Sequence, residues 1–409
     1  MDKISLNKII DKIAQDLLNQ SRIIINDKNG IYRGEIGVAI FFALYYLRGD
    51  KKDQVYLDQI YTIIEQSLNQ ISLQESNALV GVAGIGWGIQ YLVNINIITL
   101  SEVTPYVNEL SSFIKKSLTE DKQANNYDLL DGYIGKALFL IQSSKLQDNH
   151  GLQSILEDSI TFFDSFAVKD KKGVAWSCSD FTQKNTFYLG LSHGVASIIY
   201  FLSNIYLLIS DEKRKVRVRF LIEEACTWLL EKERNKDNSE LSFPSIYPRS
   251  GLNKKNSTRL AWCHGDLGIS LSLIKAGKVL GNNFFLNQGI RIATKGSKLL
   301  LHTSGIRCKQ DKFDCSLCHG VFGAFLIYHK LYEEFKIPEF RNSLNYWLSI
   351  ITKQSSNLLN APYCGIANIN KENDTLIESQ ETGLLFGVTG STLALLTYLA
   401  DISDNTLSQ

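Results

Sequence analysis

The sequence predicts an all-α protein, an α/α toroid (barrel) of seven helical hairpin repeats. Three observations lead to this fold class. A Gly-x-x-Gly turn followed by an apolar stretch recurs along the 409 residues, amphipathic segments lie between the turns, and prolines and alternating apolar runs are few. One buried and one half-buried helix per repeat are what a two-layer helical barrel requires. The whole chain, 1–409, is therefore expected to form a single domain.

The seven turns mark where the repeats begin. Neighbouring turns are far enough apart for two helices and their connections, and the fourth copy keeps Gly194 but has Ser197 in place of its second glycine. An open solenoid would show the same periodicity, but no polar cap is evident at either end of the sequence, which favours a closed ring. The leading glycines are Gly34, Gly81, Gly132, Gly194, Gly265, Gly320 and Gly387.

The elements follow from hydrophobic periodicity. Residues 1–20 alternate charged and apolar side chains at helical spacing and lack the features of a signal peptide, which indicates a cytoplasmic protein. The stretch after each turn is apolar nearly all round, as in a buried helix, whereas the segments between turns have one apolar face. Polar residues, Gly and Pro interrupt the helical pattern at 173–189 and 242–257, which predicts loops or a small β-containing insertion.

Composition excludes several classes of function. The net charge is +1, with basic and acidic residues interspersed, so a nucleic-acid partner is not expected. The apolar run 187–210 has the length of a membrane span, but its serines and His193 favour a buried helix entered through a polar turn, so no transmembrane segment is expected. Seven cysteines in a chain without a secretory signal indicate reduced thiols or metal ligands rather than disulfides.

Histidines and cysteines are concentrated at the turns. Three of the six histidines, His193, His264 and His319, directly precede a leading glycine, and Cys263 and Cys318 directly precede two of them. Zinc suits Cys and His, and a catalytic zinc has three protein ligands and one open position. The glycine lets two adjacent side chains face the same way, and the positive end of a helix favours thiolates. Cys263, Cys318 and His319 are therefore the predicted ligands of a Zn²⁺ ion.

A different zinc site is an open alternative. Cys315 and Cys318 form a Cys-x-x-Cys pair, and Cys308 is close enough in sequence for an unrelated structural site. The glycine pattern at 84–88 is too loose for a dinucleotide fingerprint, and no phosphate loop ends in Gly-Lys-Ser/Thr, so nucleotide and redox cofactors are not indicated. The remaining cysteines are expected to be small core residues: Cys178, Cys226 and Cys364.

These motifs resemble those of the lanthionine synthetase C family, which contains the lantibiotic cyclases and their eukaryotic relatives. The resemblance extends over essentially the whole chain. Each glycine motif alone is weak, but the ordered set is specific. It implies an α/α toroid with zinc at its centre, held by the three ligands named above. The motifs, in order, are Ser192-His193-Gly194, Trp262-Cys263-His264-Gly265 and Cys318-His319-Gly320.

The resemblance also implies residues for catalysis. His193 matches the family's proposed acid/base, Arg259 the arginine expected to stabilise or orient the anion, and Asp128 the aspartate expected to hold one of them. One position departs from the family, because many cyclases have Tyr where this chain has His264. That histidine would donate a proton, lie near zinc as a further nitrogen, or only pack. Asp131 is an alternative to Asp128, although its place beside a turn glycine suits capping.

The implied function is that of a zinc-dependent peptide cyclase in lanthipeptide biosynthesis. Cysteine thiols of a precursor peptide would add to dehydroalanine or dehydrobutyrine in a Michael-type reaction and close lanthionine or methyllanthionine rings. The implied partners are the dehydrated precursor peptide, a dehydratase and an exporter, which would bring the protein to the inner face of the membrane. Two rivals stay open: a prenyltransferase-like zinc toroid, for which an Asp, Cys and His ligand set is expected, and a non-catalytic peptide-binding scaffold.

Overall fold

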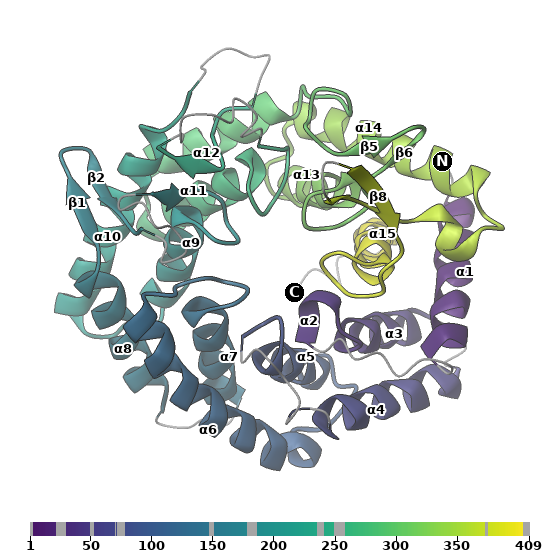
Figure 1. The fold of residues 1–409 in the computed structure, drawn as a ribbon, viewed down its shortest axis with the longest axis horizontal. Helices are drawn as coiled ribbons and strands as arrows, with labels where there is room; N and C mark the ends of the chain where they lie inside the picture. The colour runs from purple at the N-terminus through teal and green to yellow at the C-terminus, as the bar shows by residue number, and fades with distance from the viewer. Residues whose placement is uncertain are drawn as a thin grey trace. The chain divides into compact units, whose positions relative to one another are not determined.

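The structure, a computed structural model, is mostly helical, as the sequence predicts (Figure 1). Packing divides the chain into two compact units, one of residues 1–110 and 306–409 and the other of residues 111–305. The residues that the structure describes are 3–21, 30–49, 53–69, 71, 78–146, 151–177, 186–234, 241–248, 258–372 and 375–403.

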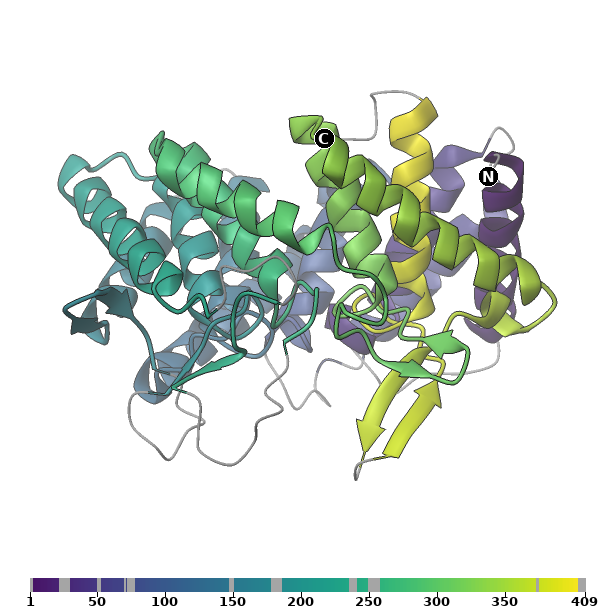
Figure 2. The ribbon, with the colours of Figure 1, turned by 90° about the horizontal axis from the view of Figure 1, so that it is seen from above.

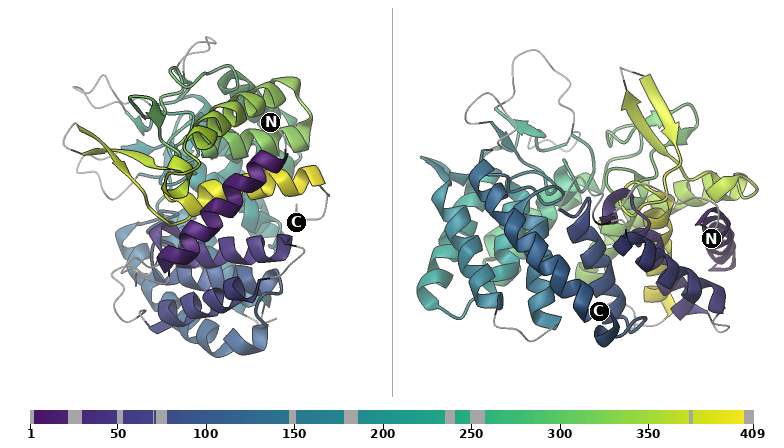
Figure 3. Two further views of the ribbon diagram at one scale, coloured as in Figure 1. Left: turned by 90° about the vertical axis from the view of Figure 1, so that its right-hand side faces the viewer. Right: turned by 60° about the horizontal axis from the view of Figure 1, so that its bottom comes forward.

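The first unit combines helices from both ends of the chain. They are α1 (Lys3–Ser21), α2 (Gly30–Arg33), α3 (Ile36–Arg48), α4 (Gln54–Asn69), α5 (Val82–Asn94), the start of α6 (Leu100–Ala124), α13 (Val321–Phe335), α14 (Pro338–Asn357) and α15 (Val388–Ser403). Helix α15 packs against α3 and α13, and α3 packs against α5. Helix α1 also packs against α15, so the first and last described helices lie side by side (Figure 3).

The second unit holds the rest of α6 and three further hairpins. These are α7 (Tyr133–Leu146) with α8 (Gly151–Ser165), α9 (Val195–Tyr206) with α10 (Glu212–Leu230), and α11 (Asp266–Leu280) with α12 (Asn283–Gly296). Helix α9 lies between α7 and α11 in this packing order. Within this unit, α9 thus packs both on its hairpin partner α10 and on α7 and α11, the corresponding helices of the neighbouring repeats.

Burial explains the two kinds of helix. All of residues 36–43 in α3 are buried, and in α9 residues 195–199 and 201–203 are buried, so these helices are covered nearly all round. Their partners bury one face only; in α10 that face contains Leu221, Ala225 and Trp228. The apolar stretches and the amphipathic segments of the sequence therefore correspond to the two layers that their patterns predict.

Four short antiparallel hairpins interrupt the helices: β1 (Val168–Asp170) with β2 (Gly173–Ala175), β3 (Phe187–Tyr188) with β4 (Ile246–Tyr247), β5 (Cys308–Lys309) with β6 (Lys312–Phe313), and β7 (Asn368–Glu372) with β8 (Thr375–Ser379). The first two confirm the predicted β-containing insertion, whose residues 178–185 and 249–257 lie outside the described residues. The other two hairpins were not predicted from the sequence. The last one, β7–β8, extends beyond the helices of its unit (Figure 2).

None of the helices among the described residues combines the length and the apolar character that a membrane span requires. The run 187–210 instead contains β3, a turn and the buried helix α9. This agrees with the buried helix predicted there.

Candidate active site

The turn before α11 shows why glycine precedes these helices. Helices α9, α11 and α13 each follow a glycine with an extended backbone, and for α11 this is Gly265. A Cβ atom on Gly265 would lie 2.0 Å from the carbonyl oxygen of Arg259, with which Gly265 forms a backbone bridge. Only glycine, which has no Cβ atom, allows the backbone at this position to come so close to the Arg259 carbonyl. The loop therefore folds back tightly and presents Cys263 and His264 immediately before the helix.

In the second unit, hydrogen bonds tie successive turns together. The backbone N–H and the hydroxyl of Ser192 both donate to the carbonyl oxygen of Cys263, each at 3.2 Å. The backbone N–H of Leu129 donates to the carbonyl oxygen of Ser192, also at 3.2 Å. Ser192 and Cys263 occupy the same position, two residues before a leading glycine. The side chains one residue further on, at His193 and His264, are thereby brought together.

Backbone hydrogen bonds connect glycine turns in the first unit in the same way. The backbone N–H of Cys318 donates to the carbonyl oxygen of Leu385 at 3.0 Å, and the N–H of Leu385 donates to that of Tyr32 at 3.2 Å. All three residues again lie two positions before a leading glycine. Both predicted cysteine ligands therefore belong to backbone connections made by the repeat, so their place does not depend on side-chain packing alone.

His193 is held by a carboxylate and by a second imidazole. Its Nδ1 atom contacts Oδ2 of Asp128, whose Oδ1 accepts hydrogen bonds from the backbone N–H groups of Leu130 and Asp131 at 2.7 and 2.9 Å. The His193 ring stacks on the His264 ring, with centroids 4.9 Å apart and an angle of 28° between planes. The His193 side chain keeps 32% of its surface exposed. The His193 imidazole is thus held in one orientation and remains partly exposed to solvent.

Two further residues, Asp131 and Tyr188, lie near the two histidines. Asp131 is exposed and supplies its N–H to Asp128, so the carboxylate in contact with His193 is that of Asp128. Tyr188 of β3, which the sequence analysis missed, has its ring 5.6 Å from His264 and 6.1 Å from His193. Its place in the weakly periodic segment 173–189 offered no signal.

Arg259 is half-buried, and the structure does not bring its guanidinium into contact with the histidines. Its main chain forms the bridge to Gly265. Among the described residues, no acidic side chain forms an ion pair with Arg259.

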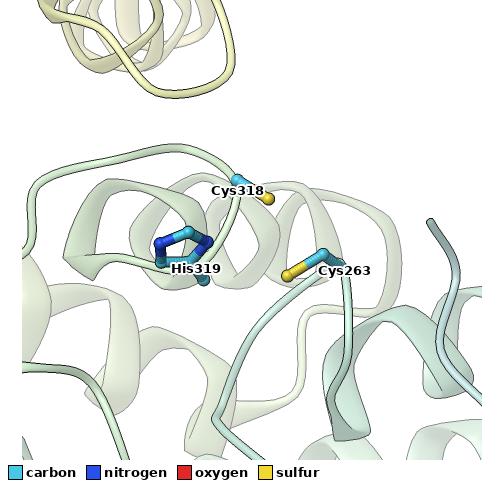
Figure 4. A group of neighbouring side chains, drawn as sticks. All are labelled: Cys263, Cys318 and His319. Carbon is cyan, nitrogen blue, oxygen red and sulfur yellow. The ribbon is translucent and has the colours of Figure 1, made fainter. Parts of the chain in front are cut away.

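The predicted metal ligands form one group. The ligand atoms of Cys263, Cys318 and His319 all lie within 4.8 Å of one another, and the three side chains are buried (Figure 4). Within the described residues, neither Cys308 nor Cys315 joins this group; Cys308 is exposed, and the Cys315 thiol donates to the carbonyl of Phe313 at 3.4 Å. Two soft thiols and one imidazole are a donor set that fits Zn²⁺ and leaves one position open.

The other cysteines agree with a core role. Cys226 and Cys364 are fully buried, and burial raises the pKa of the Cys364 thiol to about 11, so it is protonated at neutral pH. Cys178 lies outside the described residues.

A buried carboxylate that the sequence analysis missed lies behind His319. Oδ2 of Asp314 is 3.1 Å from Nε2 of His319, and Oδ1 accepts the N–H of Ser316 at 2.9 Å. Burial alone would raise the pKa of Asp314, but the nearby His319 ring and the Ser316 N–H together hold this pKa below its usual value. Nothing in the local sequence distinguishes Asp314 from a loop aspartate.

The residues directly before the leading glycines also contact one another in the first unit. The rings of His319 and Phe386 lie 5.0 Å apart at centroid distance, and the Arg33 guanidinium lies 5.3 Å from the Phe386 ring. Nε of Arg33 is 3.2 Å from Glu381. Because these three residues occupy the position of His193 and His264 in their own repeats, the repeat alignment was a signal that could have singled out Arg33.

The chain is similar in sequence to known proteins. The sequence model of one family, described as lanthionine synthetase C-like protein, matches residues 26–408. The nisin biosynthesis protein NisC of Lactococcus lactis subsp. lactis is 22% identical over 356 residues, which is 79% of each chain. Glutathione S-transferase LANCL1 of Danio rerio is 23% identical over 315 residues, 74% of this chain and 70% of the relative.

A solved structure described as nisin cyclase is similar in fold. The TM-score is 0.66 at 19% sequence identity, and the similarity covers 96% of this chain and 93% of the other. It confirms the predicted fold class, an α/α toroid.

Proposed function

The chain belongs to the lanthionine synthetase C-like family, and we propose that it is a zinc-dependent peptide cyclase that forms lanthionine and methyllanthionine rings. In this reaction a peptide thiol loses its proton, and its sulfur bonds to the β-carbon of dehydroalanine or dehydrobutyrine. The double-bond electrons move to an enolate, which takes a proton at the α-carbon. The observation that carries the proposal is the buried group of Cys263, Cys318 and His319.

We propose that these three residues hold the metal. Their donor set suits zinc, and a three-ligand site leaves a position for a substrate sulfur. Bound zinc would supply a Lewis acid that keeps the attacking thiol in its nucleophilic, deprotonated form. The low exposure of the three side chains, 5%, 4% and 7%, would exclude competing water.

His193 is the proposed proton donor to the α-carbon. Asp128 contacts Nδ1 of this ring and fixes its orientation, and an imidazole can transfer a proton near neutral pH. The two backbone N–H groups that donate to Asp128 fix the orientation of that carboxylate, as an orienting group for an acid/base requires. We assign Arg259 to the enolate oxygen, because its guanidinium has no ion pair among the described residues.

His264 is assigned to the same step as a supporting group. Its ring stacks on His193, where it restricts the orientation of the imidazole. His264 occupies the position of a tyrosine in many cyclases, and like that tyrosine it can supply a proton. A His264 variant is needed to separate support of the His193 ring from proton donation.

A second candidate function is the conjugation of glutathione, in which the same metal-ligand residues would act on the thiol of glutathione. The relative from Danio rerio is described as a glutathione S-transferase, and conjugation of glutathione to an unsaturated electrophile also begins with a thiolate. In that case Cys263, Cys318 and His319 would hold the metal for glutathione instead of a peptide cysteine.

The partners follow from the proposed substrate. Dehydroalanine and dehydrobutyrine arise by loss of water from serine and threonine, so a dehydratase must act first. We propose that the protein works in the cytoplasm with this dehydratase and an exporter, near the inner face of the membrane.

Incubation with a dehydrated precursor peptide tests the function. Cyclisation leaves the mass unchanged, so thiol alkylation followed by mass spectrometry counts the cysteines that remain free. We expect their number to fall with the parent protein and to stay constant with Cys263→Ala or Cys318→Ala, which should also lose most of their zinc. Cys315→Ala is the control. If it alone loses zinc, the ligand assignment is wrong.

A parallel reaction with glutathione and a small unsaturated electrophile separates the two candidates. Consumption of glutathione together with unchanged peptide thiols would favour the transferase and contradict the cyclase.

A further inference from the structure

Asp314 is a buried acidic residue with a restricted set of partners. Its side chain has no exposed surface, and it lies between β6 and α13 in the first unit. Its backbone N–H donates to the carbonyl of Arg307, and its own carbonyl accepts the N–H of Val321, both at 2.9 Å. The backbone is therefore anchored on both sides, and the direction of the carboxylate is fixed.

The carboxylate is shared between one imidazole and one backbone group. Oδ2 lies 3.1 Å from Nε2 of His319, and Oδ1 accepts the N–H of Ser316 at 2.9 Å. The Ser316 hydroxyl in turn accepts the backbone N–H of His319 at 3.3 Å. In the described part of the chain, His319 is the basic side chain paired with Asp314. A buried charge of this kind is costly unless its partners are well placed.

A buried carboxylate at position 314 would be useful because it can determine the tautomer of His319. A neutral imidazole has one protonated nitrogen and one with a lone pair, and only the second can bind a metal. A carboxylate facing Nε2 favours the proton on that atom and leaves the lone pair on Nδ1. Metal-bound histidines commonly donate their other N–H to a carboxylate, which fixes both the tautomer and the ring orientation.

We infer that Asp314 is a positioning residue for the metal centre: it keeps the proton of His319 on Nε2, so that the lone pair on Nδ1 would be available to a metal. This inference rests on the proposed zinc site and adds a residue that acts through His319. Asp314 itself is not one of the three grouped ligands.

The variant Asp314→Asn tests the tautomer directly. If the amide oxygen keeps the Ser316 N–H, the amide nitrogen faces Nε2 and forces it to accept a hydrogen bond, which moves the ring proton to Nδ1. Zinc affinity, measured by competition with a chromophoric chelator, should fall by about 10–100-fold, the usual effect of losing such a partner. Asp311→Asn, at an exposed position in the same segment, is the control and should bind zinc as the parent does.

Melting curves and a spectrum separate positioning from general stability. A merely structural role would lower the melting temperature of the metal-free and zinc-bound proteins equally, whereas a positioning role should shrink the zinc-induced increase. Cobalt-substituted Asp314→Asn should also show altered ligand-field bands. Zinc affinity within twofold of the parent, with an unchanged cobalt spectrum, overturns the inference and leaves the proposed function standing. A parent protein that binds no zinc contradicts both.

Discussion

The residue directly before each leading glycine determines the chemistry of its turn. In the second unit this position holds His193 and His264, whose rings stack, and the exposed Asp131. In the first unit it holds His319, Phe386 and Arg33, which contact one another in series, and Val80. The side chain at this position can be an imidazole, an aromatic ring or a cation, while the glycine behind it preserves the turn. Function can therefore vary in this fold with little change in the packing of helices.

The first prediction at this scale concerns His193. His193→Asn should slow cyclisation by about 10²–10⁴-fold, the usual contribution of a general acid or base, because Asn cannot transfer the proton. Zinc content and helical content should match the parent, since His193 is not one of the grouped ligands. The measurements are initial rates by thiol alkylation and metal analysis of the same preparation.

His264→Phe is the companion variant. Phe keeps an aromatic ring for stacking on His193 but has no exchangeable proton, so a purely supporting His264 should leave the rate nearly unchanged. Loss of turnover in His264→Phe with a normal rate in His193→Asn would move the proton-transfer role to His264.

At the scale of elements, one carboxylate links a helix to the strand pair beside the histidine turn. Asp266, the first residue of α11, accepts the backbone N–H groups of Ser242 and Phe243 at 2.6 and 3.1 Å. Those residues lead into β4, which pairs with β3, and β3 leads into the turn of His193. The position of His193 therefore depends on α11 through this connection as well as on its own turn.

The second prediction is a pH dependence of stability. Burial raises the pKa of Asp266 to about 6, against the opposing effect of the two backbone N–H groups. Between about pH 4 and about pH 6 the folded protein then binds a proton that the unfolded chain does not, so this group lowers the free energy of unfolding as pH rises, by at most about 3 kcal/mol. Urea unfolding at several pH values should show a decline that Asp266→Asn lacks. A stability difference between the two proteins that stays constant over this range would contradict the shift.

The third prediction compares two glycines near the ends of α11. A Cβ on Gly265 would lie 2.0 Å from the carbonyl of Arg259, whereas one on Gly281, at φ +65°, meets nothing within 4 Å. Gly281→Ala should cost about 1 kcal/mol of conformational strain. Gly265→Ala should cost more than about 2 kcal/mol and reduce zinc content, because the loop carrying Cys263 must shift. If denaturant unfolding shows the same loss of stability for Gly265→Ala and Gly281→Ala, the backbone at Gly265 has room for a Cβ atom and the prediction is wrong.

At the scale of the whole molecule, the fourth prediction concerns metal and stability. A ligand that binds only the folded state stabilises it by about 2.7 kcal/mol at a free concentration of 100 Kd. A chelator should therefore lower the melting temperature of the parent protein, and added zinc should restore it. Cys263→Ala is the control, because its melting temperature should respond to neither reagent. A parent protein indifferent to chelation would argue against a metal at the grouped ligands.

The all-α class, the repeat and the candidate ligands could be predicted from sequence because each depends on local pattern. A helix buried on all sides is apolar over every turn, and residues at equal positions of a repeat meet when successive turns are joined, as Ser192 and Cys263 are. The prediction of a single domain over residues 1–409 stays a prediction.

Tertiary structure alone decided which side chains meet across distant loops. Asp128, rather than the neighbouring Asp131, contacts His193, which is 65 residues away. Asp314 lies against His319, and Tyr188 reaches both histidines from a strand that periodicity did not reveal. These partners depend on how irregular segments pack against a turn. A sequence pattern records the faces of helices, but the path of a loop is set by close contacts and buried hydrogen bonds with residues remote in the chain.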